Sequence, residues 1–206
     1  MQKRDAWERF YGTRPRPWGG AIELPAIPEN GRVLEIGCGG GRMLLPCSKK
    51  IGTGGDSAEL VGMDPSRNAL LALAGECPGV LVQGDAASLP FGDGSFSLVI
   101  CRHVLEHLRR PERTEAAAEM LRVLKKGGRL HFEAFSTGDA RFRKGKQIEE
   151  RTFLRGDGII HHYFEEEEAR HLFKGASAIT ITRHGWSEKA GLEPMARESL
   201  VADVLR

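Results

Sequence analysis

The chain has 206 residues, of which 40% are hydrophobic and 28% are charged, so a folded globular domain is expected rather than a disordered chain. Its 30 basic and 28 acidic residues leave a net charge of +2, which is too balanced to indicate nucleic-acid binding by itself. The first residues lead into no apolar segment of a signal peptide, and the longest apolar run, residues 69–74, is far too short to cross a membrane. Four cysteines without a CxxC pair favour reduced thiols in a cytoplasmic protein.

Aromatic side chains and prolines mark residues 1–30. Asp5 is a suitable N-cap for a short helix over residues 6–11, and the prolines that follow predict an extended path. Two interpretations of this segment stay open. Either it packs on the domain as an arm, or it forms a lid whose aromatic and arginine side chains contact a bound ligand.

Strands and helices alternate from residue 32 onward. Short apolar runs predict buried strands, whereas amphipathic spacing with capping residues predicts helices. The alternation predicts an open, mostly parallel α/β sheet with right-handed crossovers, which binds ligands beyond the carboxyl ends of its strands. Strands are predicted at 32–36, 60–64, 80–85, 96–101 and 129–135, and helices at 41–50, 67–76 and 112–125, with a loop at 53–57.

The pattern changes after residue 135. Residues 136–164 interrupt the alternation, and so long a connection inside a domain is usually functional or mobile. A helix at 165–174 and strands at 178–182 and 199–205 are predicted to follow, and a closing hairpin of this kind would add an antiparallel strand to the parallel sheet.

A glycine-rich turn follows the first strand. Glycines at 37, 39 and 41 let a ligand lie against bare backbone, near the first N–H groups of the next helix. No segment matches the GxxxxGK[ST] pattern of a P-loop. The dinucleotide pattern GxGxxG lacks its third glycine because Arg42 stands there, which weakens the case for NAD or FAD.

Five segments in order resemble the motifs of class I S-adenosylmethionine-dependent methyltransferases, with a looser likeness to the family's broad "type 11" subgroup. The resemblance covers residues 32–135 and implies a three-layer Rossmann-like fold, with a mostly parallel seven-stranded sheet and an antiparallel last strand. One departure is the longer spacing from Glu35 to Asp64, which residues 50–57 would absorb. The segments are residues 35–41, 62–66, 84–91, 96–108 and 121–128.

This resemblance implies a site for S-adenosylmethionine. In the family, the acid that ends the second strand binds the ribose hydroxyls, and the acid after the third strand binds the adenine amino group. The acid before the glycines orients the turn and the amino group of the cofactor. The implied cofactor-binding residues are Glu35, Gly37, Cys38, Gly39, Gly41, Asp64, Pro65, Ser66, Asp85, Ala86, Arg102 and His103.

The resemblance also divides the chain. We expect a single methyltransferase domain over residues 1–206, in which residues 1–30 form the arm or lid and residues 32–135 the cofactor-binding core. Residues 136–164 are then a substrate-side insertion, and residues 165–206 a C-terminal helix and strand hairpin. Cys38 is interpreted as a small packed residue rather than a nucleophile, because no partner base is evident.

The catalytic residues stay open. Methyl transfer is an in-line displacement from an activated donor, so it requires alignment more than a fixed set of catalytic groups. His103, His161 and His162 are candidate bases, with hydrogen bonding within a loop as the alternative for the last two. Residues 103–107 also match the HxxEH pattern of some zinc proteases, but a parallel sheet is the wrong context for it and no metal is expected.

The predicted activity is methyl transfer to a small-molecule acceptor. The alternatives are methylation of an RNA nucleoside, as in tRNA, and binding of S-adenosylmethionine without catalysis. Basic residues within 136–164 could bind an anionic substrate or RNA phosphates, or simply be solvated. No membrane partner is expected.

Overall fold

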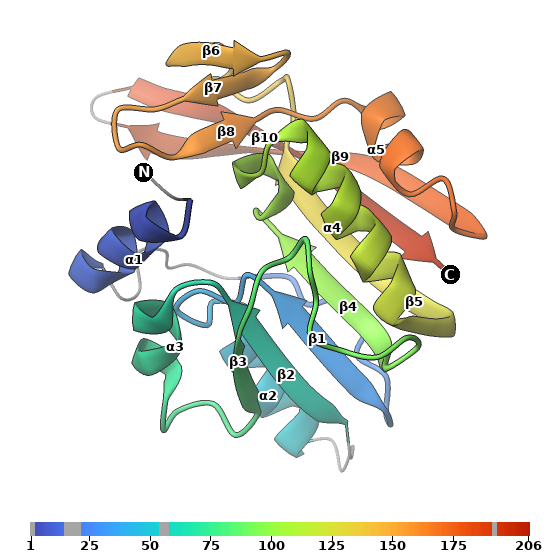
Figure 1. Ribbon diagram of the computed structural model, residues 1–206. Coiled ribbons are helices and arrows are strands. Elements are labelled where there is room, and N and C mark those ends of the chain that lie inside the picture. The colour runs from blue at the N-terminus through green and yellow to red at the C-terminus, as the bar shows by residue number, and fades with distance from the viewer. Residues whose placement is uncertain (1–2, 15–21, 54–57, 191–192) are drawn as a thin grey trace.

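A seven-stranded sheet lies at the centre of the computed structural model, which describes residues 3–14, 22–53, 58–190 and 193–206 (Figure 1). The strands follow the order β3-β2-β1-β4-β5-β10-β9. Strand β10 runs in the direction opposite to the other six strands. The predicted mostly parallel sheet with an antiparallel last strand is therefore confirmed. The strands are β1 (Arg32–Ile36), β2 (Glu59–Asp64), β3 (Val80–Gln83), β4 (Phe96–Arg102), β5 (Leu124–Phe135), β9 (Ala178–Ala190) and β10 (Glu193–Leu205).

Helices cover both faces of this sheet, which gives the expected three layers. Helices α4 (Arg110–Val123) and α5 (Glu166–Leu172) pack on one face, and α2 (Leu44–Thr53) and α3 (Arg67–Leu73) pack on the other. Figure 1 shows α4 in front of β4 and β5, and α2 behind the strands at the other side of the sheet. Alternate residues of β1 enter the two cores, which explains why the strand reads as a continuous apolar run.

Most predicted elements are confirmed within a few residues. Helix α1 (Lys3–Thr13) is longer than the predicted 6–11, and α2 begins after the glycine turn rather than inside it. Helix α4 ends at Val123 and β5 begins at once, so the predicted extension of this helix to residue 125 was wrong. The predicted extended path through the prolines, with Trp18, and most of the loop at 53–57 lie outside the described residues.

The interruption at 136–164 contains a second, small sheet. Strands β6 (Lys146–Glu149), β7 (Thr152–Leu154) and β8 (Ile160–His162) pair antiparallel in that order. Aromatic side chains form its own core, in which the rings of Phe142 and Tyr163 lie 5.4 Å apart. Figure 1 shows this sheet beyond the end of β5 and in front of the outer part of the β9–β10 hairpin, on the same side of the molecule as α1.

The last two strands form a hairpin longer than predicted. Strands β9 and β10 each span 13 residues, whereas the sequence predicted strands only at 178–182 and 199–205. Strand β10 pairs with β5 only from Ser199 to Leu205, so the preceding part of the hairpin extends past the end of β5. Backbone pairing makes strands here although the side chains are largely polar.

A short 3-10 turn, η1 (Leu105–His107), follows β4 and connects the sheet to α4. Helix α4 begins with Pro at its first turn, and the Glu112 carboxylate accepts from the Arg109 N–H at 2.9 Å. None of the described helices combines the length and the apolar composition that crossing a membrane requires.

The packing of β5 makes a stability prediction. Phe132 is fully buried, and its ring lies 5.4 Å from those of both Phe164 and Phe173. We expect Phe132→Ala to lower the free energy of unfolding by about 3–5 kcal/mol in urea denaturation, because it leaves a cavity between the sheet and α5. Leu71→Ala, at a side chain that is 51% exposed, should change it by less than about 0.5 kcal/mol. Equal effects of the two changes would contradict this packing.

Candidate cofactor and acceptor site

The turn after β1 is fixed by backbone contacts with the end of β2. The Gly37 N–H donates to the Met63 carbonyl at 2.7 Å. Gly37, Gly39 and Gly41 have φ angles of +70°, +50° and +84°, which residues with a Cβ rarely adopt. A Cβ on Gly37 would also collide with the Val104 side chain, so the turn lies directly against the segment after β4.

Asp64, the last residue of β2, connects this turn to the start of α3. Its Oδ2 accepts from the Gly39 N–H and its Oδ1 from the Ser66 N–H, both at 2.9 Å. Burial raises the pKa of the Asp64 carboxyl to about 6, although these two N–H bonds act to lower it. Since a carboxylate offers about four acceptor positions, further donors can still bind it.

Helix α1 packs over the same end of α3. The Glu8 carboxylate accepts from the Ser66 hydroxyl at 2.7 Å and from the Asn68 N–H at 3.3 Å. Tyr11 is buried, and a Cβ on Gly39 would collide with its hydroxyl group. Helix α1 therefore lies directly on the glycine turn and on the first residues of α3.

Glu35 lies beneath the turn with a carboxyl oxygen that is not satisfied. Its side chain is buried, and Oε2 has no hydrogen-bond partner among the described residues. Burial raises the pKa of the Glu35 carboxyl well above its usual value, although the positive charge of Arg102 opposes the rise. Cys38 beside it is buried too, and burial raises the pKa of its thiol, so it stays protonated. An unpartnered buried oxygen favours a ligand that brings a donor or a cation.

The ends of β2 and β3 lie side by side. The Gln83 amide donates to the Pro65 carbonyl at 3.0 Å. Asp85, two residues past β3, is exposed and accepts from the Ala87 N–H at 3.0 Å, while Ala86 is buried. The structure thus brings the implied cofactor-binding residues of three strand ends to one edge of the sheet.

The chain turns sharply at the end of β4. His103 has a φ of +55°, which is uncommon for a residue other than glycine, and its N–H donates to the Glu133 carbonyl at 2.8 Å. The preceding residue, Arg102, forms an ion pair with the Glu133 carboxylate. This backbone conformation turns the His103 ring toward Glu106, whose carboxylate lies 3.2 Å from Nδ1.

His103 is a cation at neutral pH. Burial lowers the pKa of its imidazole, but the carboxylates of Glu106 and Glu133 outweigh this effect and raise it to about 9. The ring also lies 4.3 Å from that of Phe135. An imidazolium has no lone pair left to accept a proton, so His103 does not have the properties of a general base in this state.

His161 has the opposite character. Burial lowers the pKa of its imidazole to about 2, and electrostatic repulsion from a protonated His107 and from Arg141 adds to the effect. Its Nδ1 has no hydrogen-bond partner among the described residues. The centre of the His161 ring lies 4.8 Å from that of His107, which it meets edge-on. Trp7 of α1 packs against the same His107 ring, also at 4.8 Å between ring centres. The His161 imidazole is therefore neutral and keeps a free nitrogen.

The Glu106 carboxylate lies at the centre of the zinc-type pattern at 103–107, 3.2 Å from Nδ1 of His103 and 3.7 Å from Nε2 of His107. Ligand atoms of Glu106, His107 and His161 lie within 4.8 Å of one another. Glu106 also accepts from the Phe135 N–H at 3.0 Å, and the Nδ1 of His107 lies 2.8 Å from the Ile160 carbonyl. Glu106 and His107 thus have protein partners, whereas Nδ1 of His161 has none among the described residues.

His162, the remaining candidate base, is engaged at both nitrogens. Its Nδ1 lies 2.8 Å from the Thr152 hydroxyl and its Nε2 lies 2.9 Å from the Glu168 carboxylate. These bonds attach β8 to β7 and to α5. The side chain serves the packing of the small sheet.

Comparisons with known proteins agree with this geometry. Residues 34–132 match the model of a family described as a methyltransferase domain. A solved S-adenosylmethionine-dependent methyltransferase from Methanosarcina mazei has the same fold, with a TM-score of 0.69 at 22% identity over 89% of this chain and 99% of that one. The sequence match and the fold together identify a class I S-adenosylmethionine-dependent methyltransferase domain in this chain.

Relatives of this methyltransferase differ in their substrates. The chain is 36% identical to the ubiquinone/menaquinone biosynthesis C-methyltransferase UbiE of Azotobacter vinelandii, over 63% of this chain and 48% of that protein. It is 26% identical to the tRNA N(3)-cytidine methyltransferase METTL2 of Danio rerio, over 75% of this chain and 46% of that protein. The chain thus spans about half the length of these curated relatives.

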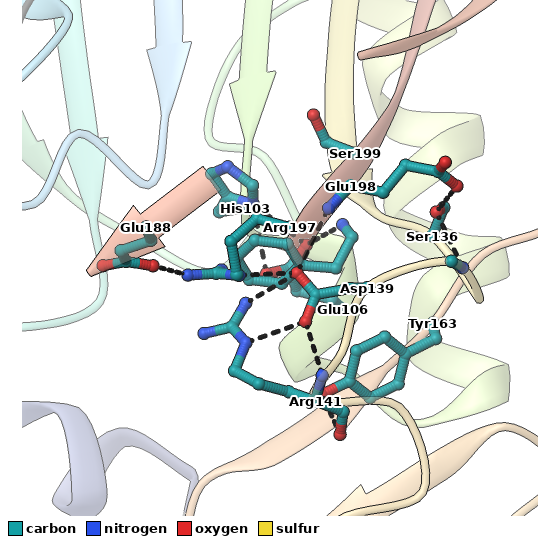
Figure 2. Close-up of polar contacts among 12 residues, drawn as sticks. His103, Glu106, Ser136, Asp139, Arg141, Tyr163, Glu188, Arg197, Glu198 and Ser199 are labelled. Carbon is teal, nitrogen blue, oxygen red and sulfur yellow. Dashed lines mark hydrogen bonds and ion pairs between the residues drawn. The ribbon is translucent and has the colours of Figure 1, made fainter. Parts of the chain in front are cut away.

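The sequence did not predict one polar cluster of this methyltransferase, which consists of Asp139, Arg141, Glu188 and Arg197. The buried Asp139 carboxylate accepts from the Arg141 Nε at 3.0 Å and from the Arg197 Nε at 2.7 Å, and Arg197 also pairs with Glu188 (Figure 2). Asp139 and Arg197 are 58 positions apart, so no local pattern predicts the contact. The only sequence signal is the Asp-x-Arg spacing, in which Asp139 also accepts from the Arg141 N–H at 2.9 Å.

The two histidines of the methyltransferase should differ in NMR titration. We expect His103 to remain protonated at pH 7.5 and to titrate near pH 9, while His161 stays neutral at pH 5. The folded pKa of His103 lies above its value of about 6.5 in an unfolded chain. Its ion pairs therefore stabilise the fold fully below about pH 6.5, and this contribution is lost as the pH rises through 9. His103→Gln assigns the signal, and a midpoint near 6.5 would refute the ion-paired arrangement.

Proposed function

We propose that this chain transfers a methyl group from S-adenosylmethionine to a small-molecule acceptor. The observation that carries the proposal is the unpartnered carboxyl oxygen of Glu35, buried beside a turn that Asp64 already fixes. Bare glycine backbone with two nearby carboxyl groups suits a ligand that brings a cation and hydroxyl groups. It does not suit a polyphosphate, which the carboxylates would repel.

Each part of the cofactor has a residue suited to hold it. Glu35 would bind the amino group, and the unused acceptor positions of Asp64 would bind the ribose hydroxyls. Asp85 and the backbone of Ala86 would bind the adenine amino group. The glycine turn would leave room for the methionine part, and the backbone at His103 would lie beside it.

Bound S-adenosylmethionine supplies a methyl group that is already activated on a sulfonium. The protein then has to orient the acceptor, exclude water and, where the acceptor requires it, take a proton. Helix α1 packs on the turn through Tyr11, which supports its role as a lid. His103 is charged and His162 is bonded at both nitrogens, so we assign proton acceptance to Nδ1 of His161.

A small molecule is favoured over RNA by the pairing of the basic residues. Within the insertion, Arg151 pairs with both Glu165 and Glu168. Charges satisfied inside the protein contribute less to a surface for RNA phosphates. The names of the relatives include both a tRNA and a quinone-biosynthesis enzyme, so RNA remains the second candidate.

All four cysteines are free thiols in the structure. Burial raises the pKa of Cys38, Cys47 and Cys101, which keeps these thiols protonated and slow to react. The cytoplasm, where thiols remain reduced, is the compartment that we propose.

Glu35→Gln tests the cofactor site by calorimetry with S-adenosylmethionine and S-adenosylhomocysteine. The affinity for both should fall about ten-fold, since the amide cannot pair with the cationic amino group. Thermal stability should hold or rise, because the buried carboxyl lacks a full set of partners. Leu71→Ala, at an exposed side chain without a role in the proposed site, is the control and should bind both ligands as the wild type does. Unchanged affinity in Glu35→Gln, or no binding by the wild type, would refute the assignment.

Release of S-adenosylhomocysteine from pooled metabolites and from unmodified tRNA tests the acceptor class. We expect turnover with a small molecule and none with tRNA. Turnover with tRNA alone would establish the RNA alternative. Cofactor binding without turnover in either pool would favour a protein that binds S-adenosylmethionine without catalysis.

A further inference from the structure

A buried guanidinium nitrogen in the small sheet has no partner. Arg155 lies in the turn that joins β7 and β8, where its N–H donates to the Ile159 carbonyl at 3.0 Å. Its Nη1 is inaccessible to solvent and makes no hydrogen bond to any described residue. A charged donor that is both desolvated and unpaired is unfavourable, so this position favours an acceptor from outside the chain.

Arg141 is only partly neutralised. The single carboxylate of Asp139 accepts from both Arg141 and Arg197, and Arg197 takes the Glu188 carboxylate as a second partner. Figure 2 shows both guanidinium groups on the same side of Asp139, with Glu188 beyond Arg197. Arg141 and Arg197 thus share the Asp139 carboxylate, and the unpaired Nη1 of Arg155 is a third cationic group without a carboxylate partner for that nitrogen among the described residues.

These positive groups act on the acceptor side of the proposed site. Arg141 and Arg155 both contribute to the low pKa of His161, and both oppose the rise that burial causes in the pKa of Tyr163. The Arg141 guanidinium also lies 4.0 Å from the centre of the Phe135 ring, whose neighbour at 4.3 Å is His103. Arg141 therefore lies close to the segment after β4, which packs against the glycine turn.

We propose that the methyl acceptor carries a carboxylate or phosphate group and that Arg141 and Arg155 bind this group. Asp139 positions Arg141, and the anion completes the hydrogen bonds of both guanidinium groups. The bound anion also counteracts the positive groups around His161, which raises the pKa of its imidazole and makes it a better proton acceptor. This inference rests on the proposed function and specifies the substrate class of the same site.

Exposed basic residues of the same segment do not share these properties. Arg143, Lys144 and Lys146 are exposed to solvent, where a charge needs no protein partner. Lys144 therefore provides a matched control on the same segment. Its change to methionine removes one positive charge but leaves the buried groups in place.

Calorimetry of the protein loaded with S-adenosylhomocysteine tests the inference, with inorganic phosphate and acetate as probes at constant ionic strength. We expect saturable binding of phosphate or acetate to the wild type and to Lys144→Met. Binding should be about ten-fold weaker in Arg141→Met and in Arg155→Met. The affinity for S-adenosylhomocysteine should stay unchanged in all three variants. If Arg141→Met misfolds because Asp139 loses a partner, Arg155→Met decides the test.

A second readout is the NMR signal of the His161 imidazole, which phosphate should shift in the wild type and not in Arg155→Met. Turnover should then occur with carboxylic acids or phosphate monoesters, which distinguishes the two sources of the anion, and fail with their neutral esters. Two results overturn this inference when S-adenosylhomocysteine binds normally: no saturable anion binding, or anion binding that is equal in the wild type and the variants. Either result leaves the proposed function standing. No binding of S-adenosylhomocysteine overturns the proposed function itself.

Discussion

The site depends first on the two N–H bonds that the Asp64 carboxylate accepts. One comes from Gly39 in the turn after β1, and the other comes from Ser66 at the start of α3. A single side chain thereby holds two segments that are adjacent in space because β1 and β2 pair in parallel. The same contact explains why Asp64 remains buried despite the free energy that desolvation of a carboxylate costs. Helix α1 also contacts this junction, because its Glu8 carboxylate accepts a hydrogen bond from the Ser66 hydroxyl.

Charge is sorted across the sheet on the carboxyl side of its strands. Around β1 and β2 the buried ionisable groups are acids, Glu35 and Asp64, and burial raises the pKa of both. Around β4, β5 and the small sheet, cations gather near the Phe135 ring, with His103 and Arg141 within 4.3 Å of it. The acids around β1 and β2 suit a cationic cofactor. The other half also contains buried carboxylates, Glu106, Glu133 and Asp139, and there the unpaired Nη1 of Arg155 is the group suited to an anionic acceptor. The two kinds of ligand would meet where β1 and β4 lie side by side.

The sequence predicted the parts of this structure whose causes are local. The parallel strands, the helix starts and the turn at Gly37–Gly41 follow from apolar runs, caps and glycines, and their order matched a family. The rise in the pKa of His103 has a local cause in Glu106, three positions on, and a distant one in Glu133, 30 positions away on another strand, which no local pattern predicts. The Asp139–Arg197 contact depends on the register of the closing hairpin. The polar outer part of that hairpin lacks the apolar alternation that predicts a strand, and backbone pairing alone forms it.

The closing hairpin has a further consequence for how such an enzyme changes over time. Strand β5 pairs with β10 from Ser199 onward, so in the outer part of the hairpin, which carries Trp186, Glu188 and Arg197, β9 and β10 pair with each other and not with β5. Insertions or deletions in this ribbon leave the register of the central sheet and the glycine turn untouched. Loss or gain of residues in pairs would even keep each side chain on its original face. Under the two sites proposed above, acceptor preference can diverge between related chains while cofactor binding is preserved, since the proposed sites lie in structurally separable parts of one fold.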